Sequence, residues 1–368
     1  MGHQLREKVR LWADGAPDVF SGREVEEAAA RISQMCGVRA VFMTGTGTQA
    51  LEIAALLTEL KPGDEVIMPS FTFVSTANPF VLRGAVPVFA DIRPDTLCLD
   101  PASVEQAITP KTRALVPVHY AGHAADMTTL LQIAEKYTLR IIEDAAHGIG
   151  ASFGGKALGS MGDAGILSFD QGKNLHCFKG GALLLRNEEW IGHAAHIVEK
   201  GTNRISFEKG LKDFYTWMEP GCNGQMSLLN AIFLAHQLDL LEEINTKRLA
   251  LWTRYHSLLT PLQKGGIAQL PAISEGCKHN GHIFYLLCQD SSQRDALIRH
   301  LAAHGITAAF HYIPLHTSPA GLKYGRFSGE DRFTTATARC LIRLPLFHEL
   351  THDQVDYICG HILEFFRS

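Results

Sequence analysis

The sequence lacks long apolar runs, closely paired cysteines and any excess of charge of one sign. None of its apolar runs approaches the roughly 18 residues that a transmembrane helix needs. Acidic and basic residues are interspersed and the net charge is −4, so neither nucleic acid nor an anionic membrane is an expected partner. The N-terminus has no apolar signal-peptide core, and the chain contains no internal repeat.

Cysteine and histidine are present without the spacings that would give them a joint role. The eight cysteines form no CxxC pair and stand mostly in apolar surroundings, which predicts reduced, packed thiols in a cytoplasmic protein. Among the histidines, His119 with His123 and His193 with His196 are close pairs that lack a third ligand nearby. No metal site is therefore expected.

The 368 residues, 46% of them hydrophobic and 20% charged, predict a globular α/β protein of two domains. Apolar strands alternate with amphipathic helices in the first part, which predicts a mostly parallel sheet covered by helices on both faces. A smaller α+β domain should follow, with the division at 1–240 and 241–368. Expected strands cover 40–43, 65–68, 86–90, 114–118, 141–143, 164–169, 182–185, 283–288 and 308–313.

Expected helices cover 5–36, 50–60, 75–83, 102–108, 127–137, 228–262, 292–304 and 354–366. Four helix starts carry capping signals. Ser21 is a plausible cap before residue 24, Asp100 precedes a proline at the first helical position, and Asp126 precedes an apolar stripe. Thr351 and Gln354 have the spacing of a capping box.

Lys173 stands just beyond the apolar run 164–169, which is typical of a buried strand that ends in a polar, glycine-containing turn. Apolar sequence also follows at 182–185, so the lysine is expected to be partly removed from water. Desolvation lowers the pKa of an ammonium group, and the neutral amine is the form that attacks a carbonyl carbon. A solvated loop lysine is the alternative.

Asp144 ends a second apolar strand and is followed by two alanines and His147. An acid at the carboxyl end of a strand in an open α/β sheet lies where ligands usually bind. A strand-end amine and a strand-end carboxylate together suit pyridoxal 5′-phosphate (PLP). The aldehyde of PLP reacts with a lysine, and an acid keeps its pyridine nitrogen protonated. Lys173 and Asp144 are therefore the predicted catalytic pair.

A turn of glycine and threonine at residues 44–49 leads directly into the helix expected at 50–60. Backbone N–H groups, hydroxyl donors and the positive end of the helix dipole meet there, which suits a phosphate. The turn is not a Walker loop, because no Gly-Lys-Thr/Ser follows, and it lacks the third glycine of a dinucleotide fingerprint. A Gly-rich turn with an ordinary cap is the alternative.

Three short motifs occur together: Gly47-Thr48 before a helix, Glu-Asp-Ala-Ala-His at 143–147, and Ser168-Phe169 shortly before Lys173. This combination resembles the DegT-type sugar-nucleotide aminotransferases, which are fold-type-I PLP enzymes. Longer similar strings lie at 61–73, 116–122, 200–204 and 311–316, and the similarity covers about residues 20–366.

The resemblance implies how PLP would be held. Lys173 would carry the cofactor as a Schiff base and shuttle a proton, and Asp144 would pair with the pyridinium nitrogen. Phe73 and His147 would lie on opposite faces of the ring. The phosphate would be held by Gly47, Thr48 and Ser168.

The resemblance also implies an assembly and a substrate side. Asn223 would reach the phosphate from a neighbouring subunit, which implies a homodimer with active sites at the interface. The sugar-nucleotide side would be lined by His311, Tyr312 and His316. Plainer alternatives remain for several of these residues: Phe73 as core, Asn223 as a turn residue, and the two histidines as structural groups.

The sequence departs from the family pattern after Lys173. A Gly-acid-Gly-Gly turn is usual there, whereas residues 177–181 are Cys-Phe-Lys-Gly-Gly, shorter and of opposite charge. Leu228 replaces a common acid, and the segment before Phe20 is short or altered. Lys179 is a competing amine, set aside because it lies outside the strand-end register of Lys173.

The expected reaction is transfer of an amino group from glutamate to a nucleotide-linked 4-keto-6-deoxy sugar. Within the family, the similarity is greatest to the transaminases that act on dTDP-4-keto-6-deoxyglucose, in the synthesis of surface polysaccharides such as lipopolysaccharide. A PLP-dependent sugar dehydratase and a non-catalytic sugar-nucleotide-binding relative are the alternatives. Dehydrating members tend to replace the lysine with histidine, so Lys173 favours transamination.

Overall fold

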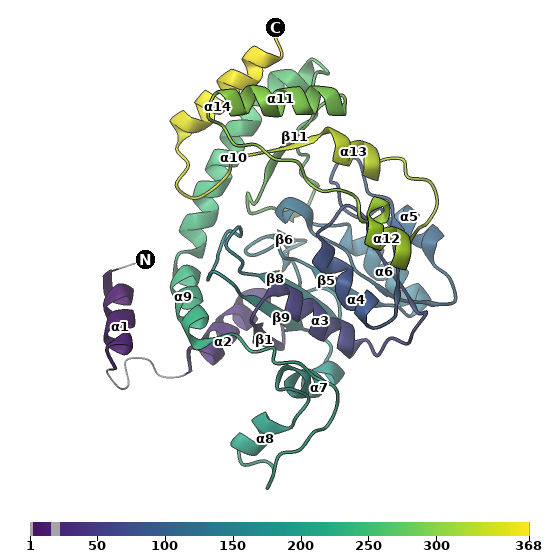
Figure 1. Cartoon of the computed structure of the whole chain (residues 1–368), viewed down its shortest axis with the longest axis vertical. Helices are drawn as coiled ribbons and strands as arrows, with labels where there is room; N and C mark the ends of the chain where they lie inside the picture. The colour runs from purple at the N-terminus through teal and green to yellow at the C-terminus, as the bar shows by residue number, and fades with distance from the viewer. Residues whose placement is uncertain (1–2, 16–22, 368) are drawn as a thin grey trace.

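A computed structural model describes residues 3–15 and 23–367 and is built around an eight-stranded sheet (Figure 1). The strand order is β1-β9-β8-β5-β4-β2-β3-β12. The strands are β1 (Ala40–Thr44), β2 (Glu65–Pro69), β3 (Val86–Ala90), β4 (Thr112–Leu115), β5 (Arg140–Asp144), β8 (Ala164–Ser168), β9 (Gly181–Leu185) and β12 (Arg326–Phe327).

Most neighbouring strands of this sheet run parallel, from β12 through β3, β2, β4 and β5 to β8. Only β9 pairs antiparallel, with β8 on one side and β1 on the other. Every residue of β2, β8 and β9 is buried, because helices cover both faces of the sheet. The predicted fold-type-I architecture is confirmed.

Helices pack on the two faces of the sheet and form two separate apolar cores. Alternate residues of β2 show the division, because Ile67 belongs to one core while Val66 and Met68 belong to the other. The Ile67 core includes α2 (Glu24–Cys36), α5 (Pro101–Ala107), α6 (Met127–Tyr137) and α9 (Leu228–Asp239). The opposite core includes α3 (Gly47–Leu57), α4 (Asn78–Leu82) and α7 (Glu189–Val198).

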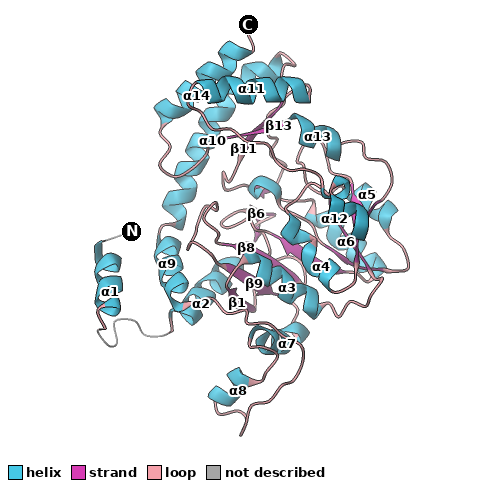
Figure 2. Cartoon of the chain, viewed as in Figure 1, coloured by secondary structure: helices cyan, strands magenta, loops and turns pink. Residues whose placement is uncertain are grey.

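The C-terminal region has a core of its own, formed from residue 251 onward. The long helix α10 (Leu241–Lys264) packs against α14 (His352–Phe365), and α11 (Ser291–Ala303) lies beside α14 (Figure 2). A two-stranded antiparallel sheet pairs β11 (Phe284–Leu287) with β13 (Leu341–Leu344). Since β12 returns to pair with β3 of the large sheet, the two regions are also joined by a strand. The division at residues 240 and 241 stays a prediction.

Smaller elements connect these parts. They are α1 (His3–Ala13), α8 (Arg204–Glu208), α12 (Pro319–Tyr324), α13 (Thr334–Cys340), the 3₁₀ helices η1 (Val74–Thr76), η2 (Tyr120–Gly122) and η3 (Leu315–Thr317), and the strands β6 (Ser152–Phe153), β7 (Lys156–Ala157) and β10 (Cys277–Lys278). The eight cysteines form no disulfide, and five of them are buried. Within the described residues, no helix is both long and apolar enough to cross a membrane.

The predicted helix caps are confirmed wherever the structure describes them. The side chain of Asp100 accepts the Ser103 N–H at 3.0 Å, and Asp126 caps α6 in the same way. Thr351 and Gln354 form the predicted capping box. Ser21 lies outside the described residues, and Arg23 precedes α2 without a side-chain cap.

Several predicted boundaries were wrong. The helical region expected at 5–36 contains α1 and α2, and α2 begins at Glu24, where the sequence predicted a helix start; the helix expected at 228–262 is broken at Leu240 between α9 and α10. The helix expected at 50–60 begins and ends three residues earlier, because Thr46 caps it. The strand expected at 308–313 is only an isolated bridge between Ala309 and Arg343, on the edge of β13 that faces away from β11.

Candidate active site

Lys173 lies in the turn that follows β8, where its backbone N–H donates to the Asp170 carbonyl at 2.9 Å. Burial lowers the pKa of its amine from 10.5 to about 8, against the opposing negative charges of Asp144 and Asp170. The positive charge of Arg343 lowers this pKa further. A substantial fraction of the amine is therefore neutral at mildly alkaline pH. Lys179, by contrast, is exposed.

Asp144 ends β5 with its carboxylate buried and oriented from two sides. Thr76 donates its hydroxyl to Oδ2 at 2.7 Å, and the Ala146 N–H donates to Oδ1 at 3.1 Å. Thr72 in turn contacts the Thr76 hydroxyl at 2.8 Å. The charge of Asp144 acts on the amine of Lys173, although no ion pair joins them among the described residues. The predicted catalytic pair thus shares one electrostatic environment.

The side chain of the preceding acid, Glu143, lies on the opposite face of the sheet from that of Asp144, because successive strand residues point to opposite faces. Its carboxylate is completely buried and accepts the backbone N–H groups of Gly159, Met161 and Gly162 at 2.6–2.9 Å. It also contacts His119 Nε2 at 2.9 Å. Glu143 therefore fixes the chain before β8 and takes no part in the site.

A buried polar network anchors the residue next to Lys173. Asn174 donates to the Asn245 side chain at 2.9 Å and to the Asn280 carbonyl at 3.0 Å, and its Oδ1 contacts His282 Nδ1 at 2.8 Å. Arg248 of α10 donates to the His282 carbonyl at 2.8 Å. Because every member has partners, the network holds the lysine turn in one position.

The expected phosphate site is a close convergence of three backbone segments. The N-terminus of α3 meets the end of β8 and the start of β9, so a Cβ on Gly47 would stand 3.0 Å from the Cβ of Ser168. A Cβ on Gly181 would stand only 2.5 Å from the Gly47 nitrogen. Thr48 lies at the same helix end, with its hydroxyl 2.8 Å from that of Ser75. Gly47, Thr48 and Ser168 are thus brought together at a helix N-terminus.

The two residues predicted to flank the ring differ in burial. His147 Nδ1 accepts the Ala121 N–H at 3.2 Å, which leaves the proton on Nε2. Burial, with the nearby charge of Lys173, holds the pKa of His147 well below its usual value, so the ring is neutral. Phe73 is 58% exposed, and its ring centroid is 6.5 Å from that of Tyr312. Phe73 is therefore no core residue.

His311 and Tyr312 lie at the same side of the site as Arg343, a residue that the sequence did not single out. Arg343 donates to His311 Nε2 at 3.3 Å, so Nδ1 carries the proton toward the Tyr120 hydroxyl, also at 3.3 Å. Burial and Arg343 lower the pKa of His311 to about 4. Burial raises the pKa of Tyr312. Both groups are neutral near pH 7.

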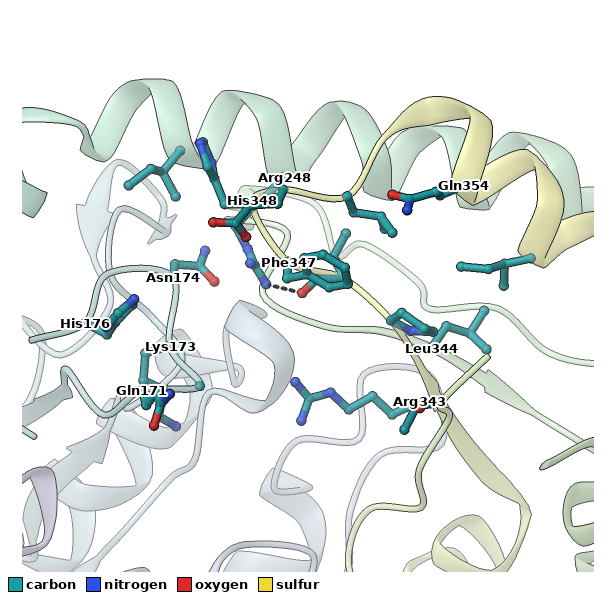
Figure 3. A pocket seen from close by; sticks show the side chains of 18 of the residues that line it. Gln171, Lys173, Asn174, His176, Arg248, Arg343, Leu344, Phe347, His348 and Gln354 are labelled. Atoms are coloured by element: carbon teal, nitrogen blue, oxygen red, sulfur yellow. Dashed lines mark hydrogen bonds between the residues drawn. The ribbon is translucent and has the colours of Figure 1, made fainter. Parts of the chain in front are cut away.

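A cavity of about 920 Å³ opens between the lysine turn and the C-terminal region. In Figure 3, Arg343 extends from β13 into this cavity toward the turn that carries Lys173. Arg343 forms no ion pair with any acid in the described part of the chain. The cavity has the size of a small-molecule site, and it presents an unmatched guanidinium to whatever enters.

His316 and Asn223 lie differently from what the resemblance implied. Both ring nitrogens of His316 have partners, the Ser70 hydroxyl at 2.7 Å and the Asp331 carboxylate at 3.1 Å, which favours the structural alternative. Asn223 is exposed, and its carbonyl accepts from Gln49 of α3 at 3.3 Å. Its role toward a neighbouring subunit stays a prediction.

The altered turn after Lys173 adopts a backbone that glycine would favour. Phe178 has φ of +66°, and its exposed ring packs edge-on against Phe233 with centroids 5.3 Å apart. Asn230 of α9 donates to the Lys179 carbonyl. Aromatic packing against α9 thus replaces the glycine-acid turn of the family while Lys173 stays in place.

The residues present fit PLP. They provide an amine of lowered pKa, an oriented carboxylate and a helix N-terminus at which two glycines leave no space for a Cβ. A family model described as the DegT/DnrJ/EryC1/StrS aminotransferase family matches residues 6–363. The chain belongs to this family. Members of the DegT family are PLP-dependent, so PLP is the cofactor of this protein.

Relatives of the DegT family include proteins with several described roles. A protein of Geobacillus stearothermophilus described as a pleiotropic regulatory protein is 32% identical over 324 residues, 88% of this chain and 84% of its own length. Among solved structures, DesV of S. venezuelae, in complex with a ketimine intermediate, is 30% identical with a TM-score of 0.87 over 99% of this chain and 95% of its own. NtdA of Bacillus subtilis, with bound PMP, is 31% identical with a TM-score of 0.87, over 100% of this chain and 83% of its own.

An aminotransferase of the same family from Brucella abortus is 28% identical with a TM-score of 0.88, over 99% of this chain and 96% of its own. These matches extend over nearly the whole chain, so fold and family are common to all of it. The DegT family is one of sugar aminotransferases.

Proposed function

We propose that the protein transfers an amino group from glutamate to a nucleotide-linked 4-keto-6-deoxy sugar, with dTDP-4-keto-6-deoxyglucose as the first substrate to test. The product would enter surface-polysaccharide synthesis, such as that of lipopolysaccharide. The observation that carries the proposal is the position of Lys173, half-buried in the turn after β8, where burial lowers the pKa of its amine and the charge of Asp144 acts on it. A cytoplasmic location is part of the proposal and is supported by the eight free thiols.

The roles of the chain's own residues follow from their positions. PLP, when bound, supplies an electron sink that holds the amino group between the two substrates. Nζ of Lys173 takes a proton from one carbon and returns it to another, which the neutral form of the amine can do and which its lowered pKa makes available near pH 8. Asp144 keeps its charge in place through Thr76 and Ala146. The neutral ring of His147 adds no competing charge.

Arg343 is the proposed anchor for an anionic part of a substrate. Its guanidinium lies in the cavity beside His311 and has no acidic partner among the described residues. Planar guanidinium groups bind carboxylate and phosphate in a two-pronged geometry. Arg343→Gln should therefore raise KM for glutamate, for the nucleotide sugar, or for both, with a smaller change in kcat. Arg343→Lys, which keeps the charge but not the fork, is the matched control.

The substrate is tested by supplying dTDP-, UDP- and GDP-linked 4-keto sugars with glutamate and identifying the amino-sugar product by mass and NMR. The proposal predicts an amino group at the carbon that carried the ketone, with dTDP-4-keto-6-deoxyglucose the best substrate. A deoxygenated sugar without an amino group would instead indicate the dehydratase alternative.

The non-catalytic alternative is kept because one relative is described as a regulatory protein. A half-reaction distinguishes an aminotransferase from a non-catalytic binding protein. Glutamate added alone to the PLP-loaded protein should change the absorbance of the bound cofactor and release 2-oxoglutarate, one molecule per site. An unchanged spectrum, with binding of the nucleotide sugar retained, would favour a binding protein.

A homodimer with shared sites is the proposed assembly. The segment 204–218, which begins with α8, projects from the body of the molecule (Figure 1) and exposes large apolar side chains. Exposed apolar patches of this kind mark interfaces. The exposed side chains are Phe207, Leu211, Phe214, Tyr215, Trp217 and Met218, of which Trp217 is 74% exposed.

Mixed dimers test whether Asn223 acts across that interface. Lys173→Ala and Asn223→Asp proteins should each be poorly active, the second because an added negative charge opposes the phosphate. If Asn223 serves the partner's site, a mixture of the two should regain activity, since one hybrid site keeps both native residues. If Asn223 serves the site of its own chain, the mixture gains nothing.

A further inference from the structure

Three histidines of the C-terminal region converge where α11 meets α14. His300 lies in the last turn of α11, His304 is the residue that ends this helix, and His361 lies on α14. One nitrogen of each lies within 4.8 Å of the others, and all three side chains are half-buried. The rings of His304 and His361 stack with centroids 3.9 Å apart, and that of His300 is 4.6 Å from His304.

The hydrogen bonds of these histidines leave one particular nitrogen free on each ring. His304 Nδ1 is 2.8 Å from the His300 carbonyl and, since a carbonyl only accepts, it carries the proton. His361 Nδ1 is 3.1 Å from the Glu364 carboxylate. In both rings Nε2 is then an unprotonated acceptor. The third, His300 Nε2, is buried without any hydrogen-bond partner.

This arrangement is that of metal-binding histidines. Such residues usually donate the N–H that faces away from the metal to a carbonyl or a carboxylate, which fixes the ring and the tautomer. His304 has a carbonyl partner, that of His300, and His361 has a carboxylate partner, that of Glu364. Ordinary packing of three histidines would account for the stacked rings. It gives no partner to His300 Nε2, and a buried polar atom left unpaired lowers stability.

We propose that His300, His304 and His361 bind one divalent transition-metal ion, Zn²⁺ foremost, through their Nε2 atoms. Imidazole nitrogens suit Zn²⁺, Cu²⁺ and Ni²⁺ rather than Mg²⁺ or Ca²⁺. Tetrahedral Zn²⁺ with Zn–N bonds of about 2.0–2.1 Å needs its ligand nitrogens about 3.4 Å apart. The present spacing of up to 4.8 Å therefore has to contract when the ion binds.

The ion would join α11 to α14 and leave a fourth position for water. It lies outside the cavity that contains Lys173, so its role is to brace the C-terminal region rather than to take part in the amino transfer. The sequence predicted no metal, because His361 is far along the chain from the other two histidines.

Metal binding is tested on the PLP-loaded protein, stripped with EDTA and dialysed against Zn²⁺ in a buffer without imidazole. The proposal predicts one tightly bound Zn²⁺ per chain by elemental analysis, and visible absorption of a tetrahedral site when Co²⁺ replaces it. His300→Ala and His361→Ala should each lose this equivalent. Glu364→Gln, which weakens the support of His361, should reduce affinity about 10–100-fold.

A double variant, His193→Gln with His196→Gln, is the matched control, because these two histidines of α7 contact Glu219 and are separate from the cluster. It should keep the full equivalent. Amino transfer by the cluster variants should persist, which shows that they fold. Absence of saturable binding in the native protein, or its loss only in the His193 and His196 variant, would overturn the proposal.

Discussion

Replacing Lys173 with methionine should raise the thermal stability of the PLP-free protein while abolishing turnover. The amine is held in a site that lowers its pKa from 10.5 to about 8, so at pH 7 the folded protein carries a largely desolvated ammonium group. Methionine has a similar shape and no charge, so the substitution removes that unfavourable burial.

The size of the expected gain in stability follows from the lowered pKa of Lys173. Each unit of pKa corresponds to about 1.36 kcal/mol, so the buried ammonium costs the folded state at most about 3 kcal/mol at pH 7. The unfolded chain holds the proton more tightly, and it binds more protons between pH 8 and 10.5. The stability of the native protein therefore rises with pH across that window, and the advantage of Lys173→Met disappears above it.

Thermal unfolding of the two PLP-free proteins measures this advantage. With an unfolding entropy of about 2.1 cal/mol/K per residue and 368 residues, a gain of about 3 kcal/mol corresponds to a rise in Tm of about 4 °C. The loss of a positive charge near Asp144 makes this an upper value. Lys179→Met, at an exposed lysine of the same turn, should leave Tm unchanged. A Tm for Lys173→Met at or below that of the native protein would refute the reasoning.

Three further substitutions test the expected phosphate site around Gly47 and Gly181, the pH dependence of stability, and the buried polar network around Asn174. Gly181→Ala should lower the free energy of unfolding by about 3 kcal/mol and weaken PLP binding, because its Cβ would strike the backbone of α3. Gly192→Ala is the control, because a Cβ at this exposed position of α7 meets nothing within 4 Å. Equal PLP affinities of the two variants would contradict this. The lowered pKa of His311, about 4 against 6.5, means that the unfolded chain binds more protons between these values, so stability falls as pH drops through that range. His311→Gln should therefore lose less stability than the native protein, by about 2 kcal/mol, between pH 7 and 5 in urea unfolding, and parallel curves would argue against it. Asn174→Ala leaves buried partners unpaired and should cost about 2–4 kcal/mol in the same assay, and a loss within error would remove the network from the account.

The sequence predicted the sheet and the lysine–acid pair because both follow from short stretches of neighbouring residues. The strand 164–168 is apolar until Ser168, and in the strand 140–144 two isoleucines precede the two acids, of which the last, Asp144, lies in the site. Capping residues such as Asp100 and Thr351 are equally local, because a cap acts within its own first turn.

The rest of the site depends on contacts that sequence patterns do not encode. Arg343 lies close enough for its charge to act on Lys173, although β13 is far from the lysine turn in the sequence, where Arg343 is one charge in an apolar run. The segment 308–313 has the composition of a strand, but it forms only a single bridge to β13. His316 has a polar partner on each ring nitrogen, which no spacing in the sequence indicates.

The central claim is that the amine of Lys173 carries the cofactor, and one chemical experiment addresses it directly. Borohydride treatment of the PLP-loaded protein fixes the cofactor covalently to the amine that holds it, and peptide mapping by mass spectrometry locates that amine. The account predicts a single modified site on the peptide that contains Lys173, absent after Lys173→Met. Modification of Lys179, or a spread over several exposed lysines with Lys173 untouched, would contradict it.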